Sequence, residues 1–169
     1  GKPMQHGVPG DGFLLANDGK GQFTDVTEAK APELKALGMI TASSFADVND
    51  DGNPDLIVVG EFMGIEIFIN QVGNFKRSTP ENLRGAKGWW SALHVVDIDQ
   101  DGDMDFVVGN HGLNSRFKAS ASQPIALFVK DFDKNGTLDP ILSKYMADGK
   151  AYPYGLRHNL IDQIKGLKK

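Results

Sequence analysis

The segment Asp97-Ile98-Asp99-Gln100-Asp101-Gly102-Asp103-Met104-Asp105 constrains the fold more than any other part of the chain. Aspartates occupy positions 1, 3, 5 and 9 of these nine residues, and a glycine occupies position 6. Apolar, strand-like runs lie on both sides, at residues 92–96 and 106–108. So many carboxylates repel one another in a compact fold unless a cation neutralises them, and hard divalent cations prefer oxygen ligands. The segment therefore predicts a calcium-binding loop between two strands.

The same template occurs three times, in loop 1 (47–55), loop 2 (97–105) and loop 3 (131–139). Side-chain oxygens at positions 1, 3, 5 and 9 can surround one cation, position 7 can offer its backbone carbonyl, and glycine at position 6 permits a sharp turn. We therefore expect up to three Ca²⁺ ions. The expected metal ligands are Asp47, Asn49, Asp51, Asn53 and Asp55; Asp97, Asp99, Asp101, Asp103 and Asp105; and Asp131, Asp133, Asn135, Thr137 and Asp139.

Two other interpretations of the loops are less consistent with the sequence. Aspartate, asparagine and glycine also form ordinary turns, but three loops in register, each followed by an apolar strand, make a simple acidic turn the minority interpretation. An EF-hand needs a glutamate at position 12, where this chain has Val58, Val108 and Leu142. Oxygen ligands without nearby Cys or His argue against zinc or copper.

The acidity of the chain is concentrated in these loops. They hold 12 of the 22 acidic residues, whereas the 18 Lys and Arg residues are scattered and form no basic stripe. We therefore expect no nucleic-acid partner. With no run of 18 apolar residues and no cysteine, the sequence predicts no membrane span, no disulfide framework and no thiolate metal site.

Strand-like runs and acidic loops alternate along the chain. Strands are expected at 41–46, 56–59, 65–69, 74–78, 90–96, 106–108 and 125–129. The residues at 45–47 and 95–97 correspond with a period of 50. A four-stranded unit that repeats at about this spacing is typical of a β-propeller blade. We therefore expect an all-β fold: a propeller fragment of two to three four-stranded antiparallel blades with Ca²⁺ loops and short helical connections, one of them within residues 31–38.

Residues 1–169 are expected to form a single propeller fragment. Its parts are the last hairpin of a preceding blade (13–27), one blade (39–79), a second blade (89–146) and a tail with a partial helix (147–169). Loop 3 is placed between the third and fourth strands of the second blade; the alternative, that it begins a third blade, stays open. The tail helix has an apolar face with no obvious partner in the sequence, made of Leu160, Ile161, Ile164 and Leu167.

The loops and the Asn-x-x-Gly-x-Phe hairpin resemble FG-GAP/VCBS repeats, the calcium-loop blades of integrin α-subunit-type β-propellers. More narrowly, the chain resembles VCBS-repeat proteins exported by Bacteroidetes-type bacteria. The segments that carry this narrower resemblance are 54–61, 88–90, 112–120, 131–136 and Asp162-Gln163. The resemblance implies a propeller of the seven-bladed type, calcium at the loops, and a location outside the cell, in the periplasm or at the outer-membrane surface. Because the chain holds about two and a half blades, we expect it to be a fragment of a longer protein.

The expected function is a calcium-binding structural or interaction module of a cell-surface or secreted protein that binds a protein or a glycan. The alternative is a lectin-like or catalytic part of a carbohydrate-active enzyme. No nucleophile elbow, phosphate-binding glycine loop or zinc-protease helix is present, so we expect no catalytic residues.

Trp89 and Trp90 are expected to pack between blades rather than to stack on sugars. His111 is a better candidate for a ligand contact than His94. Open blade edges predict self-association or marginal solubility.

Overall fold

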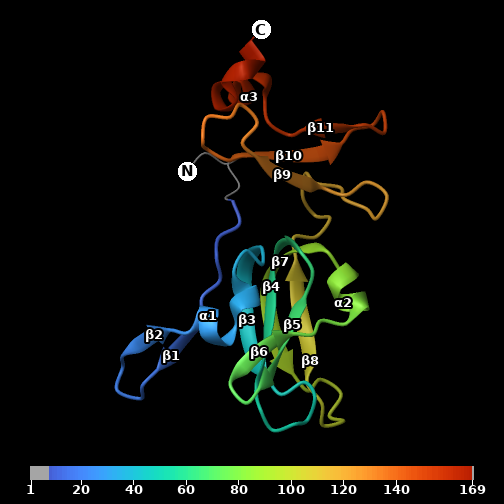
Figure 1. The fold of residues 1–169 in the computed structure, drawn as a ribbon. Coiled ribbons are helices and arrows are strands. Elements are labelled where there is room, and N and C mark those ends of the chain that lie inside the picture. Colours follow the sequence, from blue (N-terminus) through green and yellow to red (C-terminus); the bar gives the residue numbers. More distant parts are fainter. Residues whose placement is uncertain (1–7, 169) are drawn as a thin grey trace. The chain divides into compact units, whose positions relative to one another are not determined.

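The computed structural model describes residues 8–168 and divides the chain into two compact units. The first unit comprises Pro9–His111, and the second consists chiefly of Gly112–Lys169. In the first unit the elements are β1 (Leu15–Asn17), β2 (Phe23–Asp25), α1 (Thr27–Lys30), the 3₁₀ helix η1 (Pro32–Leu34), β3 (Met39–Ala46), β4 (Asp55–Met63), β5 (Glu66–Gln71), β6 (Asn74–Arg77), α2 (Glu81–Gly85), β7 (Gly88–Val96) and β8 (Asp105–Asn110) (Figure 1).

Strands β3 to β6 form a four-stranded antiparallel meander, in which each strand pairs with the next along the chain. Strand β7 begins the next hairpin with β8, and it contacts the meander through the far end of β4, where Glu61 pairs with Trp89. The β1–β2 hairpin forms a separate two-stranded sheet (Figure 1). The first unit therefore contains one complete four-stranded blade with a hairpin before it and another after it.

Strand β4 is the centre of the first unit because it is buried on both faces. Leu56 and Val58 pack with Phe68 in one apolar cluster, which also includes Ala31, between α1 and η1, and Leu34 of η1. Ile57 and Val59 point to the opposite face, as alternation along a strand requires, and pack against β7 and β8. The continuous apolar run that follows loop 1 therefore joins the blade to the elements on both of its sides.

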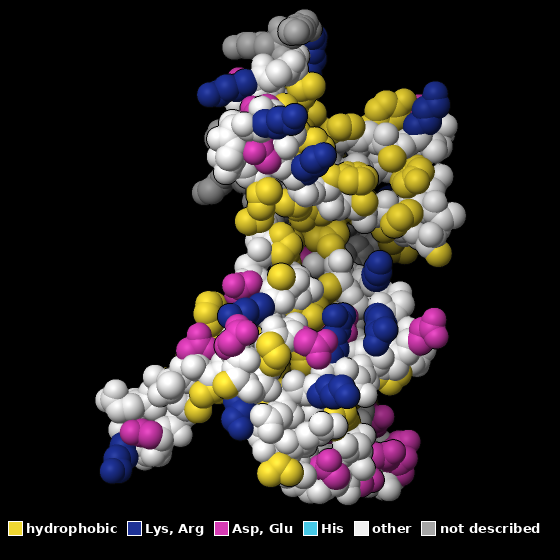
Figure 2. All heavy atoms as spheres, viewed as in Figure 1, with side chains coloured by type: hydrophobic (Ala, Val, Ile, Leu, Met, Phe, Trp, Pro, Cys, Tyr) yellow, Lys and Arg dark blue, Asp and Glu magenta, His cyan; other side chains and the backbone are white. Residues whose placement is uncertain are grey.

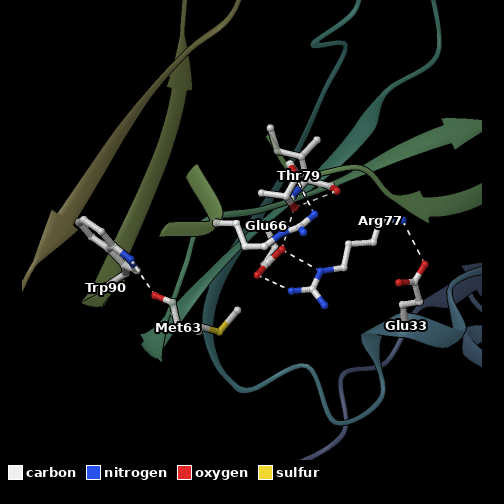
Figure 3. A network of polar contacts seen from close by, with 8 residues as sticks. Glu33, Met63, Glu66, Arg77, Thr79 and Trp90 are labelled. Atoms are coloured by element: carbon white, nitrogen blue, oxygen red, sulfur yellow. Dashed lines mark hydrogen bonds and ion pairs between the residues drawn. The ribbon is translucent and has the colours of Figure 1, made fainter. Parts of the chain in front are cut away.

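An ion pair between the partly exposed Arg77 of β6 and the buried Glu66 of β5 links these two strands (Figure 3). Arg77 donates two hydrogen bonds to the Glu66 carboxylate, from Nε at 2.8 Å and from Nη2 at 2.6 Å. The Thr79 hydroxyl donates to the same carboxylate at 2.7 Å and accepts the Ile67 N–H at 2.9 Å. Burial opposes ionisation of Glu66, but the hydrogen bonds from Arg77 and Thr79 and the positive charges nearby outweigh it, so the pKa of Glu66 lies below its ordinary value of 4.5.

We expect this ion pair to make stability depend on pH. A carboxyl whose pKa is lower in the folded chain stabilises it above the unfolded pKa, and that contribution is lost as pH falls from about 4.5 through the folded pKa. Urea unfolding in EDTA should therefore show that the free energy of unfolding falls more steeply between pH 7 and pH 3 for the wild type than for Glu66→Gln. Parallel curves for the two chains would contradict this role for Glu66.

The second unit contains β9 (Ala126–Lys130), β10 (Asp139–Tyr145), β11 (Ala151–Pro153), α3 (Arg157–Gln163) and the 3₁₀ helix η2 (Lys165–Lys168). Its three strands form an antiparallel sheet in the order β11-β10-β9. The partner that the sequence did not reveal for the tail helix lies within this unit. Ile164 is buried and lines a cavity of about 620 Å³ with Ile141 and Phe132, and the Gln163 side chain donates to the Pro140 carbonyl.

The register of the strands bears on the position of loop 3. In all three hairpins the residue before the loop pairs with the aspartate at position 9: Ala46 with Asp55, Val96 with Asp105, and Lys130 with Asp139. Loops 1 and 2 each join the first two strands of a hairpin unit, and β9 and β10 reproduce that arrangement. The shared register shows that the three loops close equivalent hairpins, and the place of loop 3 among the blades and the blade boundaries 39–79 and 89–146 remain predictions.

The fold class predicted from the sequence is confirmed. The chain is mostly β, its sheets are antiparallel, its helices are short, and the sheets do not close into a barrel or ring among residues 8–168. None of the helices in the described part of the chain is both long and apolar enough to cross a membrane.

Candidate metal sites

Loops 1 and 2 lie at the same end of the first unit. Strands β3 and β7 both pair antiparallel with β4, so they run in the same direction. Loops 1 and 2, which follow these strands, therefore lie at the same end of the sheet. Figure 2 shows carboxylate side chains gathered at the end of the first unit where these loops lie. The pKa of Asp103 in loop 2 is raised mainly by its hydrogen bond to Asp101 and by repulsion from Asp101, and repulsion from Asp50 of loop 1 adds a smaller contribution. The fold therefore concentrates negative charge at this end.

The three loops share three internal hydrogen bonds. The position-1 aspartate accepts the N–H of the position-6 glycine at 2.7 Å in loop 1, 3.1 Å in loop 2 and 2.9 Å in loop 3. The position-9 aspartate accepts the N–H of position 2 at 3.1, 3.0 and 3.0 Å, respectively. The side-chain oxygen at position 5 accepts the N–H of position 7 at 2.8, 3.2 and 2.8 Å. These bonds hold the acidic side chains on the inside of each turn.

The backbone of the loops also repeats. Position 4 adopts a left-handed conformation in each loop, with φ of 58° at Asp50, 64° at Gln100 and 58° at Lys134. The glycine at position 6 is left-handed too, with φ between 82° and 105°. Two left-handed residues within three positions turn the chain sharply, and glycine accepts that conformation without steric cost. The sequence template therefore specifies a single loop structure.

Two loops bring three carboxylates into a compact group. The groups are Asp97, Asp99 and Asp105 in loop 2, and Asp131, Asp133 and Asp139 in loop 3; in each, one oxygen per residue lies within 4.8 Å of the others. Two oxygens on opposite sides of a Ca²⁺ ion with bonds of about 2.4 Å are about 4.8 Å apart. Loop 1 has an amide at position 3 in place of the carboxylate. The donor set and its spacing fit a hard divalent cation.

Asp101 and Asp103 differ from the other acidic residues of loop 2. The hydrogen bonds from the side chain and backbone of Asp103 lower the pKa of Asp101. The hydrogen bond to Asp101 and the repulsion from it raise the pKa of Asp103. Asp103 is therefore the carboxyl of this pair that retains a proton more readily. That assignment is compatible with a cation in loop 2 that binds the backbone carbonyl of Asp103 at position 7 and the carboxylate of Asp101 at position 5.

The position-9 aspartates differ in burial. Asp55 is 0% exposed and Asp139 is 2% exposed, whereas Asp105 is exposed. Asp55 accepts a second hydrogen bond, from the Asn70 N–H at 2.7 Å. Asn70 belongs to β5, so this carboxylate joins the loop to the third strand of the blade as well as to its own turn. The sequence template did not distinguish Asp55 from Asp105. The difference arises because β5, a third strand, lies beside β4 and supplies the Asn70 N–H.

The aromatic residues singled out from the sequence have structural contacts. Trp90 donates its indole N–H to the Met63 and Ala86 carbonyls, at 3.1 and 3.2 Å, and packs against the β4 core (Figure 3). The Trp89 ring stacks on His111 with a centroid distance of 4.6 Å and an interplanar angle of 23°. Trp90 is therefore a core residue, and one face of the Trp89 ring is covered by imidazole.

The blades and loops together define an antiparallel, propeller-type repeat module. Comparison with known families finds the FG-GAP-like repeat twice, at residues 7–58 and 47–108. These two matches overlap and cover more than half of the chain, so the chain belongs to the FG-GAP-like repeat family. Each match includes loop 1, and the second extends through loop 2 to β8. No curated protein matches the chain.

Proposed function

We propose that this chain is a calcium-binding interaction module in which loops 1, 2 and 3 each hold one Ca²⁺ ion. The observation that carries the proposal is the convergence of carboxylate oxygens within 4.8 Å of one another in loops 2 and 3. The common hydrogen bonds extend the same geometry to loop 1. A bound cation would neutralise carboxylates that otherwise repel one another, and so would stabilise the folded loop.

Calcium suits these loops better than the smaller divalent ions. Ca²⁺ accepts six to eight oxygen ligands in a flexible geometry, which five loop positions and water can provide. Mg²⁺ requires nearly ideal octahedral coordination and retains its water reluctantly. The proposed ligands are the fifteen residues at positions 1, 3, 5, 7 and 9, with position 7 acting through its carbonyl. Affinity is expected at roughly 10⁻⁴ to 10⁻³ M, typical of extracellular sites.

Calorimetric titration with Ca²⁺ tests this function, and loop 2 is expected to bind most tightly. It has four acidic side chains at the ligand positions 1, 3, 5 and 9, whereas loops 1 and 3 have three. Asp101→Ala should therefore remove a tighter site than Asp51→Ala removes. Asp18→Ala, which changes an exposed aspartate in the β1–β2 turn, is the matched control and should leave the titration unchanged. Absence of heat with all four chains would reject calcium binding, and equal losses would reject the ranking.

The proposed setting is a cell-surface or secreted protein of the VCBS-repeat type, with a protein or a glycan as the partner. Sites with affinities near the millimolar range are filled where calcium is abundant, as it is outside cells. A module held together by such ions would be stable in that setting and weaker inside a cell. This proposal rests on the calcium sites and on family membership, and it assigns no catalytic residue.

A further inference from the structure

The segment made of α3 and η2, here called the α3–η2 segment (157–168), reaches back to loop 3 within the second unit. Lys165, the first residue of η2, donates its backbone N–H to Asp133 Oδ2 at 3.0 Å. Asp133 occupies position 3 of loop 3 and is one of the three carboxylates whose oxygens lie within 4.8 Å of one another. A main-chain donor therefore contacts a proposed calcium ligand that lies 32 residues earlier in the chain.

This contact distinguishes loop 3 from the other two loops. The residues at position 3 of loops 1 and 2, Asn49 and Asp99, are exposed, whereas Asp133 is half-buried. Asp133 Oδ1 accepts the Asn135 N–H at 3.2 Å, a bond within the loop, while Oδ2 accepts the N–H of Lys165. The carboxylate of Asp133 is therefore held from two sides, by its own loop and by the α3–η2 segment.

These two hydrogen bonds leave Asp133 able to bind a cation. An ionised carboxylate offers about four lone-pair sites on its two oxygens, and the two N–H donors occupy one site on each oxygen. Hydrogen bonds to a ligating carboxylate fix its orientation, and loss of such a partner typically lowers metal affinity by about 10–100-fold. The Lys165 N–H is therefore placed to position a metal ligand rather than to compete with the metal.

The α3–η2 segment depends on its contacts with the rest of the second unit. Its two helices have seven and four residues, and isolated helices shorter than about 12–15 residues are marginal in water. Ile164 is buried and lines the same cavity as Ile141 of β10, and the Gln163 side chain donates to the Pro140 carbonyl at 3.3 Å. With so few contacts, the bond to Asp133 contributes appreciably to holding the segment in place.

We propose that loop 3 and the α3–η2 segment form one calcium-responsive element, in which the Lys165 N–H positions Asp133 as a ligand and a cation in loop 3 holds the segment on β10. This inference rests on the proposed function, because it requires Ca²⁺ in loop 3. Without a cation, repulsion from Asp131 and Asp139 favours rotation of the Asp133 side chain away from the group, and the segment loses a partner. The coupling is reciprocal: the segment raises calcium affinity by the factor by which calcium favours the docked segment.

Lys165→Pro tests the positioning role because proline has no N–H to donate. Proline suits the first residue of a helix, and Ile164 before it is extended, with φ of −114° and ψ of 97°. Calcium binding to the whole chain can be followed by NMR at the Gly136 amide, which donates to Asp131 of loop 3 at 2.9 Å. Lys165→Pro should weaken binding at Gly136 by about 10–100-fold. Lys165→Ala, the matched control that keeps the N–H, should bind calcium at least as tightly as the wild type.

The Gly102 amide of loop 2, which donates to Asp97 at 3.1 Å, is the internal reference in this titration. If neither Gly102 nor Gly136 responds to calcium in the wild type, the proposed function fails and this inference fails with it. A response at Gly102 without one at Gly136 overturns the inference but retains calcium binding at loop 2. If Gly136 responds and the Pro and Ala variants of Lys165 bind calcium equally well, the inference alone is overturned.

Amide hydrogen exchange of the wild type tests the reverse direction of the coupling. The Leu167 N–H donates to the Ile164 carbonyl at 3.1 Å within the α3–η2 segment, so its exchange reports whether the segment is formed. Calcium should slow exchange at Leu167 by about 10-fold or more. Gly149 donates to the Met146 carbonyl at 2.9 Å in the β10–β11 turn and is the control, whose exchange should change much less. An equal effect of calcium at Leu167 and Gly149 would overturn the coupling.

Discussion

Asp55→Ala is expected to destabilise the first unit by about 2–5 kcal/mol even when calcium is absent. The Asp55 carboxylate is fully buried and accepts the Val48 N–H at 3.1 Å and the Asn70 N–H at 2.7 Å. Alanine would leave both donors without their partner, and an unsatisfied buried donor costs about 1–3 kcal/mol. Urea unfolding in excess EDTA measures this effect apart from any loss of metal binding.

Asp105→Ala is the matched control for this measurement. Asp105 occupies the same loop position and accepts the Ile98 N–H at 3.0 Å, but it is exposed, so water can replace the lost carboxylate. We expect a loss below about 1 kcal/mol, typical of surface substitutions. Equal losses for Asp55→Ala and Asp105→Ala would show that the bond to β5 contributes nothing, and would remove the structural distinction between the two loops.

The loops could be predicted from the sequence because each of their features has a local cause. The glycine at position 6 supplies the left-handed turn, and short acidic side chains accept backbone N–H groups within the same nine residues. The β4 strand was predictable for a similar reason: a continuous apolar run such as residues 56–59 fits a strand that is buried on both faces. Local chemistry was sufficient for both predictions.

The remaining features depend on contacts between distant residues. Nothing in the pattern of residues 158–167 indicated that Ile164 would line a pocket together with Ile141, because Ile141 lies on another element. The burial of Asp55 depends on Asn70, fifteen residues further along the chain. The spacing of the loops likewise did not fix which strands pair around loop 3, and the structure shows that they are β9 and β10. In each case the missing information was which strand lies alongside, and that is decided by tertiary packing.

Chelation of calcium is expected to lower the melting temperature of the first unit by about 10 °C or more. At free calcium 10 to 100 times the dissociation constant, one site stabilises the folded state by about 1.4–2.7 kcal/mol. Loops 1 and 2 both lie in this unit, so their contributions together reach about 3–5 kcal/mol. For a unit of about 100 residues, each kcal/mol shifts the melting temperature by about 4–8 °C. Scanning calorimetry with 10 mM CaCl₂ and then with EDTA measures the difference.

A double variant separates metal binding from other effects of the chelator. Asp51 and Asp101 are exposed, and each accepts a hydrogen bond from the position-7 N–H that water can replace. Asp51→Ala with Asp101→Ala should therefore melt near the wild type in EDTA but gain much less from calcium. An unchanged wild-type melting temperature in EDTA would contradict structural calcium. If calcium raised the melting temperature of the double variant as much as that of the wild type, the ions would bind outside these loops. Metal binding stabilises a fold only through the residues that ligate the metal in the folded state.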